Sequence, residues 1–431
     1  MRGLVTVLAI VLAAPVLSQS PPGVRQETVR LRAEDGGGFF GIYHTPAGAQ
    51  PATAYLFMHP RGGNVTHFAL QPLAEKGFGA LGMGSRSMNR TGIHEEFVLD
   101  VAAGVKFLRS RGVKQIILVG HSGGGSLMSF YQSQAETAPP NRVKSTPAGD
   151  PPDLNRFDMP KADALITLNA AEGEGLHFSH HLDPSLTDEH DPFSYDPSLD
   201  MYNPENGFRV PPEQTKYTPE FVDRVTRAQQ ARARRLVELA RSYVREQDYY
   251  RSLMQSPAFK QMSLNDQLII ERRAEFDRPM ILYRTRADLR YYDLSIDQSD
   301  REVGHMTGPE KDGHRRSDLR NWRYEDPLST GITAREFLST LSADSHARMW
   351  DNMAKIRVPV LVVNSSADSG IHRSEHEKTF AAVGSTDKEK LWIVGGEHGL
   401  EPHGPQGGRG DQRVQFVDAI TRWATKRWPS S

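Results

Sequence analysis

Residues 115–130 read QIILVGHSGGGSLMSF, an apolar run followed by a glycine-rich turn and a helix-compatible segment. The run from Gln115 to Val119 is typical of a strand that is buried on both faces of a parallel sheet. The turn has the pattern Gly-x-Ser-x-Gly, in which side chains at the outer positions would collide with the adjoining strand and helix. This order of strand, turn and helix predicts that Ser122 Oγ projects from the carboxyl edge of the sheet.

Similar apolar runs, each ending in Gly, Pro, Asn or Ser, recur along the chain at 54–58, 78–83, 115–119, 164–168, 358–363 and 391–394. Between the second and third runs, residues 95–111 carry apolar side chains at helical spacing, and Gly112 ends the segment. Ahead of them, residues 27–32 and 39–43 flank a glycine turn and predict an antiparallel hairpin. Strands that alternate with helices predict an α/β fold with a mostly parallel, doubly wound sheet.

This rhythm is interrupted after the sixth predicted strand. About 190 residues separate Leu168 from Val358, far more than the single crossover helix that a parallel pair of strands needs. The gap predicts a large, mainly helical insertion over residues 171–354. The core then comprises residues 21–170 and 355–431.

Within the insertion, Thr218-Pro219-Glu220 predicts the start of a long helix that runs to about residue 246. Further helices are expected over residues 264–276 and 334–353. The arginines of the long helix predict a solvent-exposed basic face; they are Arg224, Arg227, Arg232, Arg234, Arg235, Arg241 and Arg245.

A serine hydroxyl is a weak nucleophile and needs a base, together with a group that orients the base. Asp368 follows the apolar run 358–363, and His398 follows the apolar run 391–394. All three side chains would therefore meet at one edge of the sheet, in the chain order Ser, Asp, His. We expect His398 to take the proton of Ser122 and Asp368 to fix the tautomer of His398.

The triad acid has an alternative position, because Glu172 and Glu174 follow the strand 164–168. Acyl transfer also needs donors for a developing oxyanion. The turn at residues 58–64, MHPRGGN, lies after the first core strand, and the backbone amides of Arg61 and Gly123 are the candidate donors.

Three segments, GHSGG at 120–124, PVLVV at 359–363 with Asp368, and GEHG at 396–399, together resemble the α/β-hydrolase superfamily of serine esterases. The resemblance covers residues 27–170 and 355–428, and the chain departs from it at His59-Pro60, where the superfamily usually has His-Gly. It implies that the insertion forms a cap over the active site. It also implies cleavage of carboxylic esters through an acyl-enzyme, without a cofactor, on a small-molecule or acyl ester substrate. Amide or peptide hydrolysis by the same triad, and a catalytically silent binding protein on the same fold, are the alternatives.

Residues 177–191 of the insertion are rich in His, Asp and Glu, which are ligands for zinc or calcium. No spacing in this stretch matches a known metal signature. Polar contacts of the lid or contacts with substrate are the leading interpretation, and a metal site is the alternative.

Composition excludes several other classes. Lys and Arg total 52 against 53 Asp and Glu, a formal net charge of −1, so no strong field attracts a nucleic acid. The chain has no cysteine, which excludes disulfides, thiolate metal sites and a cysteine nucleophile.

The N-terminus has the layout of a secretory signal peptide. Arg2 precedes an uncharged run from Gly3 to Ser20 that is at the short limit for crossing a bilayer. We therefore expect residues 1–20 to be a signal peptide and the mature protein to be secreted or periplasmic, without stable membrane insertion.

Overall fold

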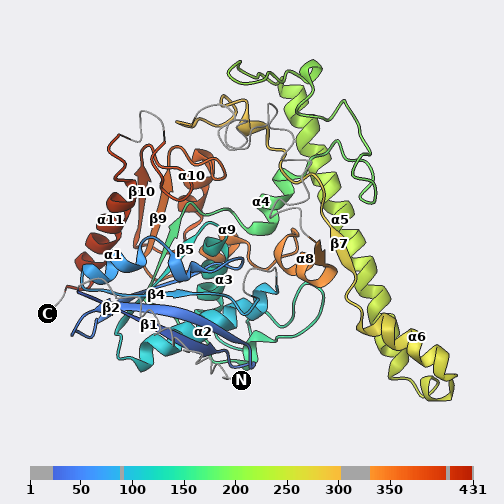
Figure 1. The fold of residues 1–431 in the computed structure, drawn as a ribbon, viewed down its shortest axis with the longest axis horizontal. Coiled ribbons are helices and arrows are strands. Elements are labelled where there is room, and N and C mark those ends of the chain that lie inside the picture. The colour runs from blue at the N-terminus through green and yellow to red at the C-terminus, as the bar shows by residue number, and fades with distance from the viewer. Residues whose placement is uncertain (1–22, 88–91, 302–330, 404–407, 430–431) are drawn as a thin grey trace, which may run out of the picture.

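The structure is a computed structural model that describes residues 23–87, 92–301, 331–403 and 408–429. The predicted signal peptide lies outside these ranges. An eight-stranded sheet forms the core, in the order β1-β2-β4-β3-β5-β6-β9-β10 (Figure 1). Its strands are β1 (Val24–Arg32), β2 (Gly38–Pro46), β3 (Thr53–Met58), β4 (Gly79–Met83), β5 (Gln115–His121), β6 (Ala164–Leu168), β9 (Val360–Ser365) and β10 (Lys388–Ile393).

The sheet is mostly parallel, as predicted. The pairs β1–β2 and β2–β4 are antiparallel, and every other pair of neighbours runs parallel. All residues of β3, β4, β6 and β9 are buried, because helices cover both faces. The predicted hairpin, the doubly wound α/β sheet and the crossover helix are therefore confirmed.

Alternate side chains of the strands enter two apolar layers. Leu56 and Leu118 face the layer that contains α2 (His94–Ser110), α3 (Gly123–Ala135) and α9 (Met349–Met353). Tyr55 and Phe57 face the other layer, with α1 (Leu70–Glu75) and α11 (Gln412–Arg427). Because helices cover both faces of the sheet, a site is expected in the loops outside the carboxyl ends of the parallel strands.

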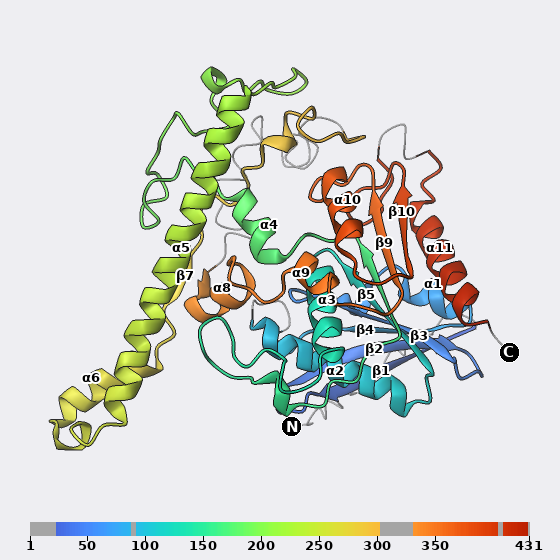
Figure 2. The ribbon, with the colours of Figure 1, turned by 180° about the vertical axis from the view of Figure 1, so that it is seen from behind.

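A long insertion separates β6 from β9. It contains α4 (Glu174–His181), α5 (Pro219–Met254), α6 (Leu264–Glu275), the short strands β7 (Pro279–Ile281) and β8 (Gly331–Thr333), and α8 (Ala334–Thr340), before α9. The 36-residue helix α5 runs past the body of the molecule, and α6 lies at its far end (Figures 1 and 2). In the ranges that the structure covers, no helix is both long and apolar enough to cross a bilayer.

Three predictions about the insertion are wrong. The long helix does not end at about residue 246 but continues to Met254, because its last turns contact α6, where Arg251 Nε donates to Ala274 O at 3.2 Å. Residues 334–353 do not form one helix, because the chain leaves helical geometry after α8 and the backbone of Ser342 packs against Gly175, where a Cβ would meet Ser342 O. Arg232 does not lie on a solvated face. It is fully buried, with Nε and Nη2 each 2.9 Å from an oxygen of the Glu189 carboxylate, so it belongs to the interior of the insertion.

Candidate active site

Ser122 lies in the sharp turn between β5 and α3, at φ 56° and ψ −128°. A non-glycine residue rarely adopts such a backbone conformation, and surrounding contacts must hold it there. The Ser122 N–H donates to Leu168 O at 3.0 Å. A Cβ on Gly124 would lie 2.7 Å from Met58 O, and one on Gly120 would lie 2.5 Å from Gly124 O. The two glycines therefore permit the close approach that the turn requires.

Asp368 and His398 are joined by a hydrogen bond in the loops that follow β9 and β10. His398 Nδ1 lies 2.9 Å from Asp368 Oδ2, and the other carboxylate oxygen accepts the amides of Gly370 and Ile371 at 2.8 and 3.1 Å. Burial lowers the pKa of His398, but the charge and hydrogen bond of the buried Asp368 raise it more, so the net pKa lies above the usual 6.5. A proton on Nδ1 leaves Nε2 as the proton acceptor.

Ser122 and His398 are brought to the same edge but are not directly bonded. The ring centroids of His121 and His398 are 5.2 Å apart, so the turn of Ser122 and the loop of His398 are in contact. In the described ranges Ser122 Oγ makes no hydrogen bond, and none joins it to His398 Nε2. Bonds between nucleophile and base are commonly long without substrate and tighten in the complex. We expect this contact to form with substrate bound.

The two alternative acids have other partners. Arg61 Nε and Nη2 donate to Glu174 Oε1 at 3.1 and 2.7 Å, and His94 Nε2 lies 3.3 Å from Glu174 Oε2. Burial raises the pKa of Glu174, but Arg61 and His94 outweigh it and hold this pKa far below the usual 4.5. Glu172 lies 2.8 Å from His180 Nδ1. Asp368 is therefore the carboxylate that orients His398.

The two predicted oxyanion donors differ in their surroundings. Gly123 begins α3, and its N–H has no acceptor in the part of the chain that the structure covers, as is normal for a first helical turn. The Arg61 N–H instead lies 3.0 Å from His59 Nδ1, which also contacts Arg61 O. The sequence could not show this, because residue types do not determine how the side chain of His59 folds back on its own loop.

Asn169 and His94 lie beside the site although no motif indicated them. Asn169 is fully buried directly after β6, and its Nδ2 donates to His398 O at 2.8 Å. Its place at the carboxyl end of a core strand is a signal that could have identified it. His94, at the start of α2, has no such signal, since only the folded chain brings it to Glu174.

Side chains of the His- and Asp-rich stretch 177–191 lie close to charged side chains elsewhere in the insertion. His181 Nε2 lies 3.4 Å from Asp288 Oδ2, and Asp183 Oδ2 lies 2.7 Å from Arg284 Nη2. Among the residues with described positions, no three His, Asp or Glu side chains are grouped so that they could hold a metal ion. The contacts thus link α4 to the segment 284–288 of the insertion.

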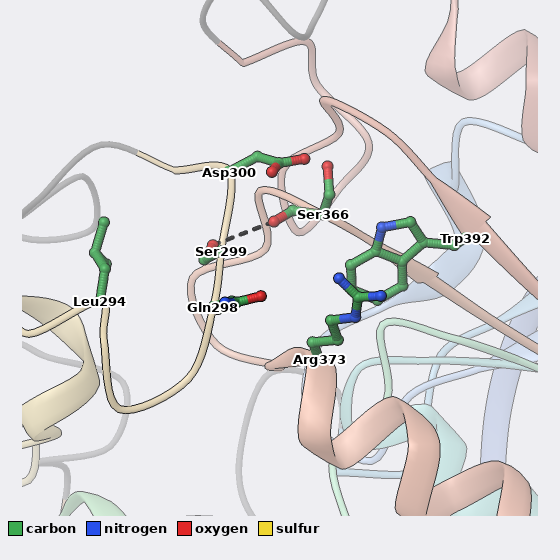
Figure 3. Close-up of a pocket in the computed structure, with 7 residues that line it drawn as sticks. All are labelled: Leu294, Gln298, Ser299, Asp300, Ser366, Arg373 and Trp392. Carbon is green, nitrogen blue, oxygen red and sulfur yellow. Dashed lines mark hydrogen bonds between the residues drawn. The ribbon is translucent and has the colours of Figure 1, made fainter.

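The insertion also contacts the loop that carries Asp368. Ser299 Oγ and the Asp300 N–H donate to Ser366 O at 3.2 and 3.0 Å, and Arg301 Nη1 donates to Ser369 O at 3.2 Å. Figure 3 shows the Ser299–Ser366 bond between two residues that, with Trp392, line a pocket. The pocket has a volume of about 260 Å³. The segment 299–301 therefore contacts the loop of Asp368 on both sides of that residue.

Part of the chain is similar in sequence to a known protein family. Residues 301–402, less than half of the chain, match the profile of a family described as serine aminopeptidase, S33. The matched range contains Asp368 and His398 but not Ser122. No curated protein sequence matches the chain.

Three solved structures with a similar course of the chain share low sequence identity with it. DcsB in complex with its substrate analogue has a TM-score of 0.49 and 13% identity, over 94% of this chain and 100% of the other. The α/β hydrolase GrgF from Penicillium sp. sh18 has a TM-score of 0.46 and 13% identity, over 93% of this chain and 97% of the other. The esterase domain of a Rhodothermus marinus protein has a TM-score of 0.42 and 12% identity, over 93% of this chain and 98% of the other. The strand order and the family match confirm the α/β-hydrolase fold that the sequence predicted.

Proposed function

We propose that this chain is an exported serine hydrolase that cleaves carboxylic esters through an acyl-enzyme intermediate. The observation that carries the proposal is the 2.9 Å bond between His398 Nδ1 and the buried carboxylate of Asp368, at the edge where Ser122 projects from its strained turn. A serine hydroxyl is activated by a neighbouring base whose ring is held in place by a carboxylate.

In the proposed reaction, Ser122 Oγ attacks the ester carbonyl while His398 Nε2 accepts its proton. The imidazolium is stabilised by Asp368 and then donates the proton to the departing alkoxide, which leaves the acyl group on Ser122. A water molecule, deprotonated by His398, attacks the acyl carbonyl, and the proton returns to Ser122. No electron transfer or metal is needed for this cycle.

The negative charge that develops on the carbonyl oxygen needs donors. The Gly123 N–H at the start of α3 is the first, and it lies at the positive end of a helix dipole. The Arg61 N–H is the second, and it requires His59 to release it when substrate binds. A single missing donor costs about 10²–10³-fold in kcat in hydrolases of this type, so the second donor matters.

Amide hydrolysis is the second candidate, favoured by the match of residues 301–402 to a family described as serine aminopeptidase. Both reactions use the same triad and differ in how the leaving group is protonated. We place the ester first because an alkoxide departs more readily than an unprotonated amide nitrogen, so ester cleavage depends less on protonation of the leaving group.

The test compares p-nitrophenyl esters with p-nitroanilides of the same acyl groups, using the purified full chain and a Ser122→Ala variant. We expect turnover of at least one ester series and loss of that turnover in the variant, by about 10⁴-fold or more. Anilide turnover that exceeds ester turnover would select the amidase alternative. Turnover of neither series by protein with a cooperative thermal transition would contradict the proposal.

A further inference from the structure

The backbone carbonyl of His398 accepts hydrogen bonds from two side chains. His121 Nε2 lies 2.8 Å from His398 O, and Asn169 Nδ2 lies 2.8 Å from the same oxygen. His121 ends β5 next to Ser122, and Asn169 directly follows β6. Two neighbouring strands of the sheet therefore bind the loop that carries the proposed base.

The tautomer of His121 follows from its contacts. A carbonyl oxygen can only accept, so His121 Nε2 must carry the hydrogen. His121 Nδ1 then accepts from His67 Nε2 at 3.2 Å, and His67 Nδ1 accepts the Ala69 N–H at 3.3 Å. Burial lowers the pKa of both rings, to about 3 for His67 and well below the usual value for His121. Both rings are neutral, and the chain of donors has one direction, from Ala69 to His398.

The side-chain amide of Asn169 is fixed in the same way. Its Oδ1 accepts the Ser365 N–H at 2.8 Å, which leaves Nδ2 to donate to His398 O and, at 3.3 Å, to Glu397 O. The residue is fully buried at φ 42°, a left-handed conformation that asparagine tolerates better than most residues. This side chain thereby connects the ends of β6 and β9 to the loop of His398.

We propose that His121 and Asn169 are positioning residues for His398. They hold its backbone carbonyl from β5 and β6, while Asp368 holds its ring from the loop after β9, so both the backbone and the ring of His398 are held in place. The inference rests on the proposed function of Ser122 and His398. Neither residue is a second base, because both nitrogens of His121 already have partners and the amide of Asn169 does not titrate.

The geometry separates conservative from disruptive variants at position 121. A glutamine extends about as far as Nε2 of histidine and can still donate to His398 O, whereas an asparagine is too short to do so. We expect His121→Gln to keep kcat within a few-fold of the parent. We expect His121→Asn to lower kcat on the order of 10²-fold with little change in KM, because misplacing a catalytic group by about 1 Å has an effect of this size.

At position 169, aspartate keeps the oxygen that accepts the Ser365 N–H. It replaces the Nδ2 donor with a second oxygen, which would face the carbonyl oxygens of Glu397 and His398. Asn169→Asp should therefore lower kcat at least as much as His121→Asn. His44→Asn is the matched control, since His44 is a buried histidine of β2 and pairs with Ala80, away from the site. It should leave kcat unchanged.

The deciding measurement is the ester kcat of these variants together with the downfield NMR resonance of the proton between His398 and Asp368. Loss or broadening of that resonance in His121→Asn, with retention in His121→Gln and His44→Asn at comparable thermal stability, supports the inference. Parent-like kcat and an unchanged resonance in His121→Asn and Asn169→Asp overturn it. If the parent protein is inactive, the proposed function fails, and the resonance still tests whether the two side chains position His398.

Discussion

The basicity of His398 is set by its neighbour Asp368. Burial lowers the pKa of His398, while the charge and the 2.9 Å hydrogen bond of Asp368 raise it above 6.5. A base is active only when it is deprotonated, so kcat/KM should rise with pH and reach its plateau above pH 6.5.

Asp368→Asn removes the negative charge that raises the pKa of His398 and reverses the preferred tautomer of the His398 ring. We expect kcat to fall by about 10⁴-fold and the acidic limb of the kcat/KM profile to move to lower pH, because burial, which lowers the pKa of His398, is then no longer opposed by Asp368. Ester turnover measured across this pH range in both proteins provides the check. An acidic limb at the same pH in the variant would mean that another group is the base.

Arg61 and Glu174 form a buried ion pair beside the same turn. The side chain of Glu174 is 4% exposed and that of Arg61 23%, so Arg61→Met leaves a carboxylate without its main partner in the interior. We expect a loss of about 3–5 kcal/mol in the free energy of unfolding by urea. Glu174→Gln, which removes the charge and keeps the shape, should cost less.

The pH dependence of this ion pair has a defined sign. The pKa of Glu174 is lowered by folding, so the stabilisation is complete above the ordinary value of 4.5 and is lost as the pH falls below it toward the folded pKa. The stability difference between the parent and Glu174→Gln should therefore shrink on acidification below pH 4.5. A difference that grew instead would show that Glu174 is not ionised in the folded protein.

At the scale of single elements, the turn between β5 and α3 tolerates no added methyl group. Gly124→Ala lies in a helix, where alanine normally stabilises by about 0.5–1 kcal/mol. Here its Cβ would lie 2.7 Å from Met58 O, so we expect destabilisation of about 1–3 kcal/mol and weakened esterase activity. Gly38→Ala is the control, because a Cβ there meets nothing within 4 Å. Thermal unfolding of both variants tests this prediction. A Gly124→Ala variant that is more stable than the parent would contradict the close approach of Gly124 to Met58 O.

The strands β3, β5 and β6 could be predicted because each is a short apolar run in the buried part of the sheet, and their observed bounds follow those runs closely. The prediction for β10 was less accurate, since this strand covers Lys388–Ile393 and buries only Ile393. The predicted helix over 264–276 is observed as Leu264–Glu275, where Ser263 caps the first turn. The helix over 334–353 was wrong, since its apolar spacing continues through a bend that is set by contact between Ser342 and Gly175. Contacts of that kind join segments far apart in the sequence, and local spacing does not contain them.

Position in the sequence indicated Ser122, Asp368 and His398, because the ends of parallel strands meet at one edge. It did not indicate the direction of the Arg61 amide or the roles of His67 and Asn169. Those depend on rotamers and loop turns that only packing selects.

At the scale of the whole molecule, the sheet and the insertion differ in how much they bury. Every residue of β3 and β6 is buried, whereas α6 buries only Ile270 and Ala274 and exposes Leu264 to 72%. Segments with few buried apolar contacts open locally without global unfolding. The insertion could be delimited from the sequence by its length, but the burial of Arg232 inside it could not, since an arginine stripe normally indicates a solvated face.

Native-state hydrogen exchange should reflect this difference. Amides of α6 and of the adjoining end of α5 are expected to exchange through local openings, while those of β3, β5 and β6 exchange only at the free energy of global unfolding. Exchange followed by peptide mass analysis, at several low concentrations of denaturant, separates the two regimes. Equal protection of α6 and the sheet would show that the arm formed by α5 and α6 is packed against something that this chain alone does not supply.

The direct test of the whole account is covalent labelling by a fluorophosphonate probe followed by mapping of the modified peptide. An activated serine should give one adduct, on the peptide that contains Ser122, and none in a folded Ser122→Ala variant. Undiminished labelling of that variant, or an adduct on another residue, would contradict the assignment of Ser122 as the nucleophile.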